Sequence, residues 1–296
     1  MVAFSWFPIL DGLARAMLLF LIASGLSIIF GLMGVVNFAH GAFYAIGAFT
    51  GITLLGYLDF SNAFFVVLLI APLVALIIGV AVERYTIQPL YSEEPIYQVL
   101  LTFGITIVIE DALVLIFSRN QQMLPPPDLL AGATELPVID TFYPTYRLFV
   151  IGLGLLVAVL LWLVISRTRI GIIIRAGTLD SEMVELQGIN VRRLFTLMFG
   201  FGVALAALGG LAAGPIFSVQ PQMGHSVLID AFLVVILGGV GSIRGTFVGA
   251  LGIGYIKSIG GFYLSEWVGI ILFSLMIIFL LVRPYGMFGE PGVLEH

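Results

Sequence analysis

Apolar residues form long runs along the chain, and short polar stretches separate them. A run of about 20 apolar residues is long enough to cross the hydrocarbon core of a bilayer as a helix. The count of crossings is eight or nine, because two of the apolar segments are interrupted and the run at 228–240 is short for a crossing. We therefore expect an all-α integral membrane protein, a polytopic helix bundle. The predicted spans are residues 8–30, 34–57, 62–82, 98–117, 148–165, 194–217, 228–240, 246–259 and 267–282.

The composition agrees with this class. The chain has 296 residues, of which 60% are hydrophobic and 10% are charged. A soluble domain carries about 25% charged residues. The absence of cysteine excludes disulfides and thiolate metal sites. The chain also lacks a basic tail, so we expect no binding to nucleic acid. We expect one transmembrane permease domain over residues 1–293, followed by an affinity-tag remnant at residues 294–296.

The distribution of basic residues predicts the orientation. Five of the twelve Lys and Arg residues lie in the loop 167–193, between two spans. Lys and Arg accumulate in loops that stay in the cytoplasm. The loop 118–146 has few basic residues and a Pro-rich run, so we place it outside. Arg283 follows the last span and places the C-terminus in the cytoplasm.

Two predicted spans contain unusual polar or glycine-rich stretches. Residues 34–57 include Asn37 and His40 among several glycines, and residues 238–245 read GGVGSIRG. A lipid-facing helix would not carry such groups, so we expect two broken helices, the first near residues 37–41, buried against protein. Residues 40–47 can be laid over residues 244–251. That similarity favours an inverted repeat, or it is a chance likeness of two glycine-rich helices.

The first broken segment and the turn at 238–245 supply the candidates for a substrate pathway, which are Asn37, His40, Gly41 and Arg244. Two interpretations stay open for His40: it hydrogen-bonds carbonyls freed by the break, or it lines the pathway. Two interpretations also stay open for Arg244: it hydrogen-bonds carbonyls of the turn, or it lies at the cytoplasmic mouth of the pathway.

Residues 180–187 read as a short helix in the basic loop, which Gly188 would end. One side of it is apolar and needs a partner. The helix either lies flat on the lipid headgroups or docks a cytoplasmic subunit. The candidate coupling residues are Leu179, Asp180, Met183, Val184, Glu185, Leu186, Gly188 and Arg193.

Recognisable enzyme chemistry is absent from the sequence. Residues 252–258 superficially resemble a phosphate-binding loop, but no glycine precedes Lys257 and the stretch lies in a predicted span, so we expect no ATP binding by this chain. No metal-ligand spacing or nucleophile motif occurs. Glu110 and Asp111 are the acids that we place within the membrane, off its centre. They form a carboxylate pair for proton relay, or they face the bundle interior or the outer headgroups.

The chain resembles the branched-chain amino acid ABC transporter permease family of the LivH type. The resemblance extends over residues 10–289, and the stretch 118–146 is not part of it. The segments that carry it are GVVNFAHG at 34–41, TRIG at 168–171 with Arg175 and Ala176, GIN at 188–190 with Arg193, LGGVGS at 237–242 with Gly245, and Arg283-Pro284 with Gly286.

The resemblance implies a permease subunit of an importer in the bacterial inner membrane, without a cofactor of its own. It implies a homologous second permease, two cytoplasmic ATP-binding subunits and a periplasmic binding protein as partners. It makes residues 178–190 the coupling helix, with Glu185 and Gly188 in the part that resembles the family's motif. Relatives that move urea, amides or aromatic acids leave those substrates as alternatives. A stand-alone secondary transporter or channel is the rival function. It would more often bury a charge pair for ion coupling, and we expect none here.

Overall fold

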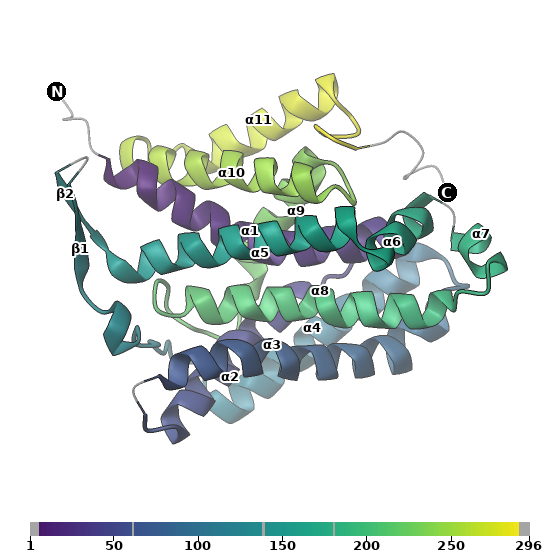
Figure 1. The fold of residues 1–296 in the computed structure, drawn as a ribbon, viewed down its shortest axis with the longest axis horizontal. Coiled ribbons are helices and arrows are strands. Elements are labelled where there is room, and N and C mark those ends of the chain that lie inside the picture. The colour runs from purple at the N-terminus through teal and green to yellow at the C-terminus, as the bar shows by residue number, and fades with distance from the viewer. Residues whose placement is uncertain (1–5, 61, 138–139, 180, 290–296) are drawn as a thin grey trace.

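The computed structural model describes residues 6–60, 62–137, 140–179 and 181–289, and these residues form a bundle of helices (Figure 1). The elements are α1 Phe7–Met33, α2 His40–Tyr57, α3 Ala63–Val82, η1 Glu83–Ile87, η2 Gln88–Leu90, α4 Pro95–Phe117, η3 Asp128–Leu130, β1 Ala133–Leu136, β2 Thr141–Pro144, α5 Thr145–Arg167, α6 Arg169–Leu179, α7 Ser181–Leu186, α8 Val191–Ala213, α9 Met223–Gly238, α10 Ile243–Tyr263 and α11 Val268–Val282.

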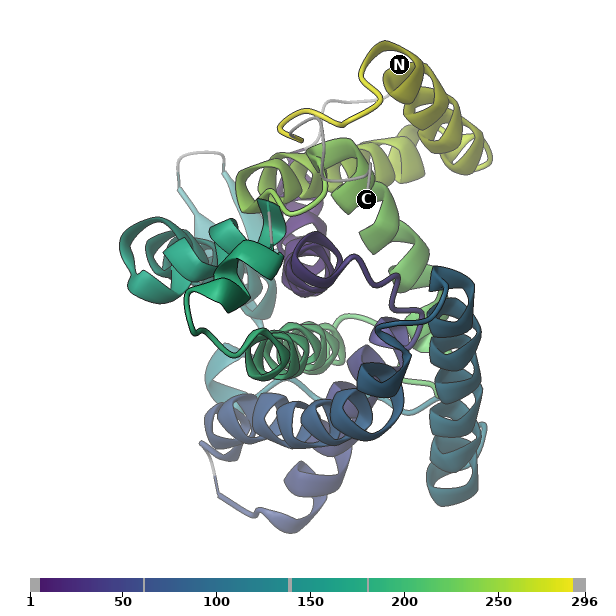
Figure 2. The same cartoon turned by 90° about the vertical axis from the view of Figure 1, so that its right-hand side faces the viewer.

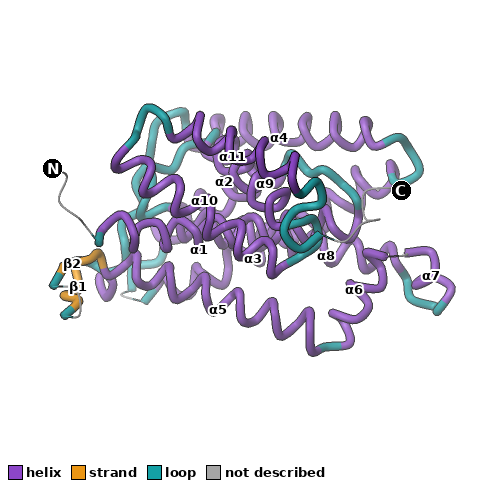
Figure 3. The backbone as a smooth tube through the Cα atoms, turned by 90° about the horizontal axis from the view of Figure 1, so that it is seen from above, coloured by secondary structure: helices purple, strands orange, loops and turns teal. Residues whose placement is uncertain are grey.

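The two ends of the bundle differ in structure. The antiparallel hairpin of β1 and β2 lies at one end, and α6 and α7 lie at the other (Figures 1 and 3). We call these the hairpin end and the basic end. The sequence predicted a long loop at 118–146 and one short helix at 180–187. The structure adds the hairpin to the first loop, and it adds α6 to the second.

Helices α1 and α8 form the centre of the bundle, as the view along the helices shows (Figure 2). Glycines let the backbones approach closely here. A Cβ on Gly202 of α8 would lie 2.8 Å from the carbonyl oxygen of Gly25 in α1, and one on Gly210 would collide with Tyr44 of α2. Small residues at helix interfaces are typical of packing in lipid. The small-residue series along residues 200–214 is therefore a packing face, as the sequence predicted.

Five described helices are long and apolar enough to cross a membrane: α1, the continuous stretch from α3 to η2, α4, α5 and α8. Two shorter apolar helices are α9 and α11. The side chains on the outer faces of α4, α5 and α11 are largely exposed and apolar, as lipid contact requires. The prediction of a polytopic helical membrane protein is confirmed. The number of crossings stays a prediction.

The prediction of broken helices is wrong. Residues 34–39 are not helical, but they join the end of α1 to the start of α2, so no helix continues on both sides. Gly34 ends α1 with a φ of 66°, and its N–H donates to the Phe30 carbonyl. A short non-helical connection explains the polar sequence better than a kink, because some of its backbone groups find partners in another helix.

The buried connection at 34–39 runs back into the bundle. His40 Nε2 donates to the carbonyl of Ile22, 2.9 Å away, and Ile22 lies about 16 Å before the end of α1 along its axis. The connection finds partners on α4: Phe38 N donates to Thr102 Oγ1 at 3.3 Å, and that hydroxyl lies 3.4 Å from the Val36 carbonyl. Non-helical backbone is thus kept away from lipid.

The second predicted break is a turn, residues 239–242, between α9 and α10. Gly239 and Gly241 have φ values of 99° and 76°, which explains the need for glycine there. Ser242 caps α10 by accepting the N–H of Gly245 at 3.1 Å. Each predicted break is therefore a connection between two helices, and the described residues give no support for an inverted repeat.

We expect a methyl group at Gly47 to destabilise the bundle. Its Cβ would collide with the backbone of Ala207 in α8, whereas a Cβ on Gly104 of α4 would meet nothing within 4 Å. Overpacking costs about 1–3 kcal/mol, and backbone cannot move aside as a side chain can. Gly47→Ala should lower the thermal unfolding midpoint of the detergent-purified protein, and Gly104→Ala should not. Equal midpoints would contradict the packing described here.

Candidate functional site

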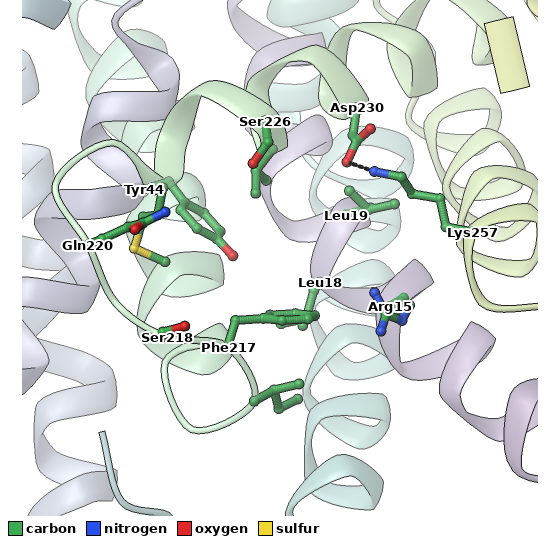
Figure 4. A pocket seen from close by; sticks show the side chains of 13 residues that line it. Arg15, Leu18, Leu19, Tyr44, Phe217, Ser218, Gln220, Ser226, Asp230 and Lys257 are labelled. Carbon is green, nitrogen blue, oxygen red and sulfur yellow. Dashed lines mark hydrogen bonds and ion pairs between the residues drawn. The ribbon is translucent and has the colours of Figure 1, made fainter. Parts of the chain in front are cut away.

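A cavity of about 460 Å³ lies between α1, α2, α9, α10 and the loop that joins α8 to α9 (Figure 4). We call it the hairpin-end cavity, because it lies in the half of the bundle near β1 and β2. Its volume is within the range of about 300–1,000 Å³ that is usual for small-molecule sites. The lining residues are Arg15, Leu18, Leu19, Tyr44, Ile216, Phe217, Ser218, Gln220, Met223, Ser226, Val227, Asp230 and Lys257.

An ion pair forms one wall of the hairpin-end cavity. Lys257 of α10 donates to Asp230 Oδ2 of α9, and Figure 4 shows the two side chains facing each other. The Lys257 side chain is 33% exposed and the Asp230 side chain 13%. Each charge is therefore largely removed from water, and the pair compensates part of that cost.

Arg15 contributes a second positive charge to the same cavity. Its Nε donates to Asp11 Oδ2 at 2.7 Å, and its guanidinium lies 5.3 Å from the centroid of the Phe217 ring. Asp11 also accepts from Arg147 of α5, and the Ser258 hydroxyl of α10 lies 3.1 Å from it. Three helices thus hold Arg15 in place at the cavity wall.

The sequence analysis missed Asp230, Lys257 and Arg15. The sequence analysis expected no charge pair for ion coupling and did not foresee that Asp230 of α9 pairs with the partly exposed Lys257 of α10. A signal was present: Lys257 is the only lysine of the chain, and it lies in the middle of an apolar run. It was considered only as part of a phosphate-binding loop. Asp230, in a run that is short for a span, gave no pattern that would link it to Lys257.

Glu110 and Asp111 point in different directions. Glu110 is buried, with its Oε1 2.5 Å from His225 Nε2, an ion-pair distance without hydrogen-bond geometry, while Asp111 is exposed. They do not form a paired-carboxylate site. Among the described residues, no three or more His, Cys, Asp and Glu side chains gather closely enough to hold a metal ion.

Three of the four predicted pathway residues lie together at the start of α2. Asn37 and His40 are fully buried, and Gly41 packs against the backbone of Gly224 in α9. The side-chain amide of Asn37 has no hydrogen-bond partner among the described residues, and neither has Nδ1 of the His40 ring. Asn37 and His40 line none of the cavities described here. Gly41 borders a small cavity of about 40 Å³ beside Glu110.

Arg244, the fourth pathway residue, is separate from the others. It is exposed and lines a cavity of about 600 Å³ at the basic end, between α1, α5, α6 and the turn before α10. Arg175 of α6 lines the same cavity and donates to the Ile165 carbonyl of α5. The pathway candidates therefore occupy two places, one in the core and one at the basic end.

The predicted coupling residues lie on and around α7. Met183 and Leu186 are 54% and 78% exposed, whereas Val184 is buried. The predicted apolar side of α7 therefore packs only in part against the bundle. Glu185 and Gly188 are exposed, and Gly188 follows α7 with a φ of 80°. Asp180 lies outside the described residues, as does residue range 294–296, and the Leu179 side chain is likewise not described.

Arg193 stands at the start of α8, next to α7. Its side chain is exposed, and its backbone N–H donates to the side chain of Asn190 at 2.9 Å, which caps the helix. The sequence analysis did not identify this cap, although Asn before a helix is a usual signal for one. The cap fixes the direction in which α8 leaves the basic end.

Residues 8–281 match the family model described as the branched-chain amino acid transport system permease component. The chain is 32% identical to the permease protein BraD of the high-affinity branched-chain amino acid transport system of Pseudomonas aeruginosa, over 96% of both chains. It is 29% identical to LivH of Escherichia coli, over 92% of both. It is also 30% identical to the ribose import permease protein RbsC of Haemophilus influenzae, over 65% of this chain and 58% of that one.

We expect replacement of His40 by Leu to destabilise the protein. The Ile22 carbonyl would lose the additional hydrogen bond from His40, and a buried hydrogen bond contributes about 0.5–1.5 kcal/mol to stability. His40→Leu should lower the thermal unfolding midpoint, and His40→Gln, which keeps a donor, should lower it less. An unchanged midpoint with reduced transport would instead support the pathway interpretation of His40.

Proposed function

Because the chain belongs to the family of branched-chain amino acid transport system permease components, we propose that it is the membrane-spanning subunit of an ABC importer for branched-chain or related amino acids. The observation that carries the proposal is the match over residues 8–281, supported by the identity with BraD along 96% of both chains. The chain supplies the passage through the membrane, and its partners hydrolyse ATP.

A permease of this family acts with ATPase and binding-protein partners. We propose two ATP-binding subunits at the basic end, a homologous second permease beside this chain, and a periplasmic binding protein at the hairpin end. The exposed side chains of Arg169, Arg192 and Arg193 at the basic end support this orientation, because basic residues stay in the cytoplasm. In a bacterial inner membrane, α11 then ends on the cytoplasmic side.

The segment from α6 to α7 has the form that coupling to an ATPase needs. It protrudes at the basic end (Figure 1), and it is held to the bundle by the buried Val184 and by Ile174, which is 6% exposed. Met183 and Leu186 present apolar surface away from these anchors. A movement of the ATPase would therefore reach α5 through α6, and α8 through α7, as changes in helix position.

We propose that the substrate route ends at the basic-end cavity, with Arg244 at its inner mouth. Asn37, His40 and Gly41 lie deeper, where the connection at 34–39 meets α2 and α9. Their buried, partly unsatisfied polar groups would become part of the route only in a state in which α2 and α9 separate. Such a state is what alternating access requires of helices that are closed here.

A secondary transporter is the second candidate, because the partly buried pair of Asp230 and Lys257 has the form of an ion-coupling site. Such a protein would move substrate in response to an ion gradient, without ATPase subunits. The two functions therefore differ in their energy source, which reconstitution measures.

We expect ATP-dependent uptake of L-leucine by liposomes that contain the complete complex and its binding protein. Liposomes that contain this chain alone should take up none, with or without a proton or sodium gradient. A complex with an ATPase variant that binds but does not hydrolyse ATP is the matched control. Gradient-driven uptake by the chain alone would establish the secondary transporter instead.

We expect the double substitution Met183→Asp and Leu186→Asp to release the ATPase during purification. Both side chains are exposed, so the permease should still fold, and losing an apolar anchor at an interface can cost about 2 kcal/mol or more. Arg193→Ala should only weaken transport, because its backbone N–H keeps the cap from Asn190. A double variant that still co-purifies with the ATPase would show that α7 lies on lipid headgroups.

A further inference from the structure

The hairpin-end cavity combines two kinds of wall. Asp230, Lys257 and Arg15 gather on one side, and Leu18 and Phe217 lie together beside them (Figure 4). Val227 adds a further apolar side chain to the lining, and Tyr44, Ser218, Gln220 and Ser226 add neutral polar groups. A structural ion pair alone gives no reason for a cavity beside it, since interiors normally pack without such voids. Charged and polar groups at fixed positions beside apolar side chains are usual for a small-molecule site.

The charges around the cavity do not balance. Arg15, Arg147 and Lys257 face the two carboxylates of Asp11 and Asp230, which leaves one surplus positive charge among these five groups. Arg15 uses only its Nε toward Asp11 in the bonds described, and a guanidinium carries five N–H donors. The cavity thus has capacity for one carboxylate of a ligand.

The same cavity offers an acceptor for a cation. Asp230 accepts Lys257 through Oδ2, and an ionised carboxylate has about four lone-pair positions. A ligand ammonium group can therefore bind Asp230 while the ligand carboxylate binds Lys257 and Arg15. On binding, the pair of Asp230 with Lys257 is replaced by two pairs, one between Asp230 and the ammonium group and one between Lys257 and the ligand carboxylate. Each charge therefore has a partner in the free and in the bound state.

We propose that the hairpin-end cavity binds a free α-amino acid as a zwitterion, with its ammonium group on Asp230, its carboxylate on Lys257 and Arg15, and its aliphatic side chain against Leu18, Phe217 and Val227. This inference rests on the proposed function, and it adds a substrate site inside the permease itself. The cavity selects for the paired charges of the amino acid, while the apolar wall favours an aliphatic side chain.

Equilibrium binding of radiolabelled L-leucine to the purified permease–ATPase complex, without the binding protein, tests the inference. The competitors are 4-methylpentanoate, which lacks the ammonium group, and 3-methylbutylamine, which lacks the carboxylate. In the wild type each should compete about tenfold or more weakly than leucine. Lys257→Met should reduce the preference over the amine, because Arg15 alone then binds the carboxylate, and Asp230→Asn should remove the preference over the acid.

Two further variants separate recognition from structure. The double variant Asp230→Lys with Lys257→Asp keeps an ion pair. Its thermal unfolding midpoint should therefore be higher than those of the single variants Lys257→Met and Asp230→Asn, but it should not bind leucine. Glu266→Gln removes an exposed carboxylate from the loop between α10 and α11, outside the cavity, and should bind leucine as the wild type does. Binding restored in the double variant, or unchanged in all variants, would overturn the inference.

A lipid headgroup with the same charges is the other source of a zwitterion. In nanodiscs of phosphatidylglycerol alone, leucine should still bind. If phosphatidylethanolamine instead raises the unfolding midpoint through Lys257 and leucine does not bind, the cavity is a lipid site and the inference is wrong. Uptake by the same complex with its binding protein separates the two proposals: uptake without binding in the cavity refutes only this inference, and no uptake refutes the permease function.

Discussion

Contact between backbones at glycine residues is the interaction on which the rest of the structure depends. Lipid supplies no hydrophobic force that would press one apolar helix against another, so close packing must do it. Gly25 and Gly202 bring α1 against α8, Gly254 meets Ala16 where α10 meets α1, and Gly41 meets Gly224 where α2 meets α9. These approaches fix the helix axes. The hairpin-end cavity is the space that remains between helices held in this way.

The apolar pattern was sufficient to predict the helices and the membrane. It recovered α3, α4, α5 and α11 closely, because each lies with much of its surface toward lipid and is a plain apolar run. The apolar pattern failed for segments that are surrounded by other helices and not by lipid. Residues 34–39 read as part of a span, since nothing local shows that Thr102, 66 residues from Val36 along the chain, provides a hydrogen-bond partner.

The site was harder to predict than the fold because its parts come from different helices. Asp230 and Lys257 are 27 residues apart, and their contact is set by how α9 turns back into α10 at the glycines of residues 239–241. Similarly, the apolar pattern of α7 could not distinguish Val184, which is buried, from Leu186, which is exposed. Helical periodicity gives the side of a helix, and only the neighbouring helices decide which side is covered.

The non-helical connection at 34–39 changes how movement passes between α1 and α2. A continuous helix transmits both displacement and rotation, because each turn is bonded to the next. Residues 34–37 lack those helical hydrogen bonds, and each of them has two soft dihedral angles. A rotation of α1 about its axis therefore reaches α2 through contacts such as that of His40 with Ile22, and not through a continuous helical backbone.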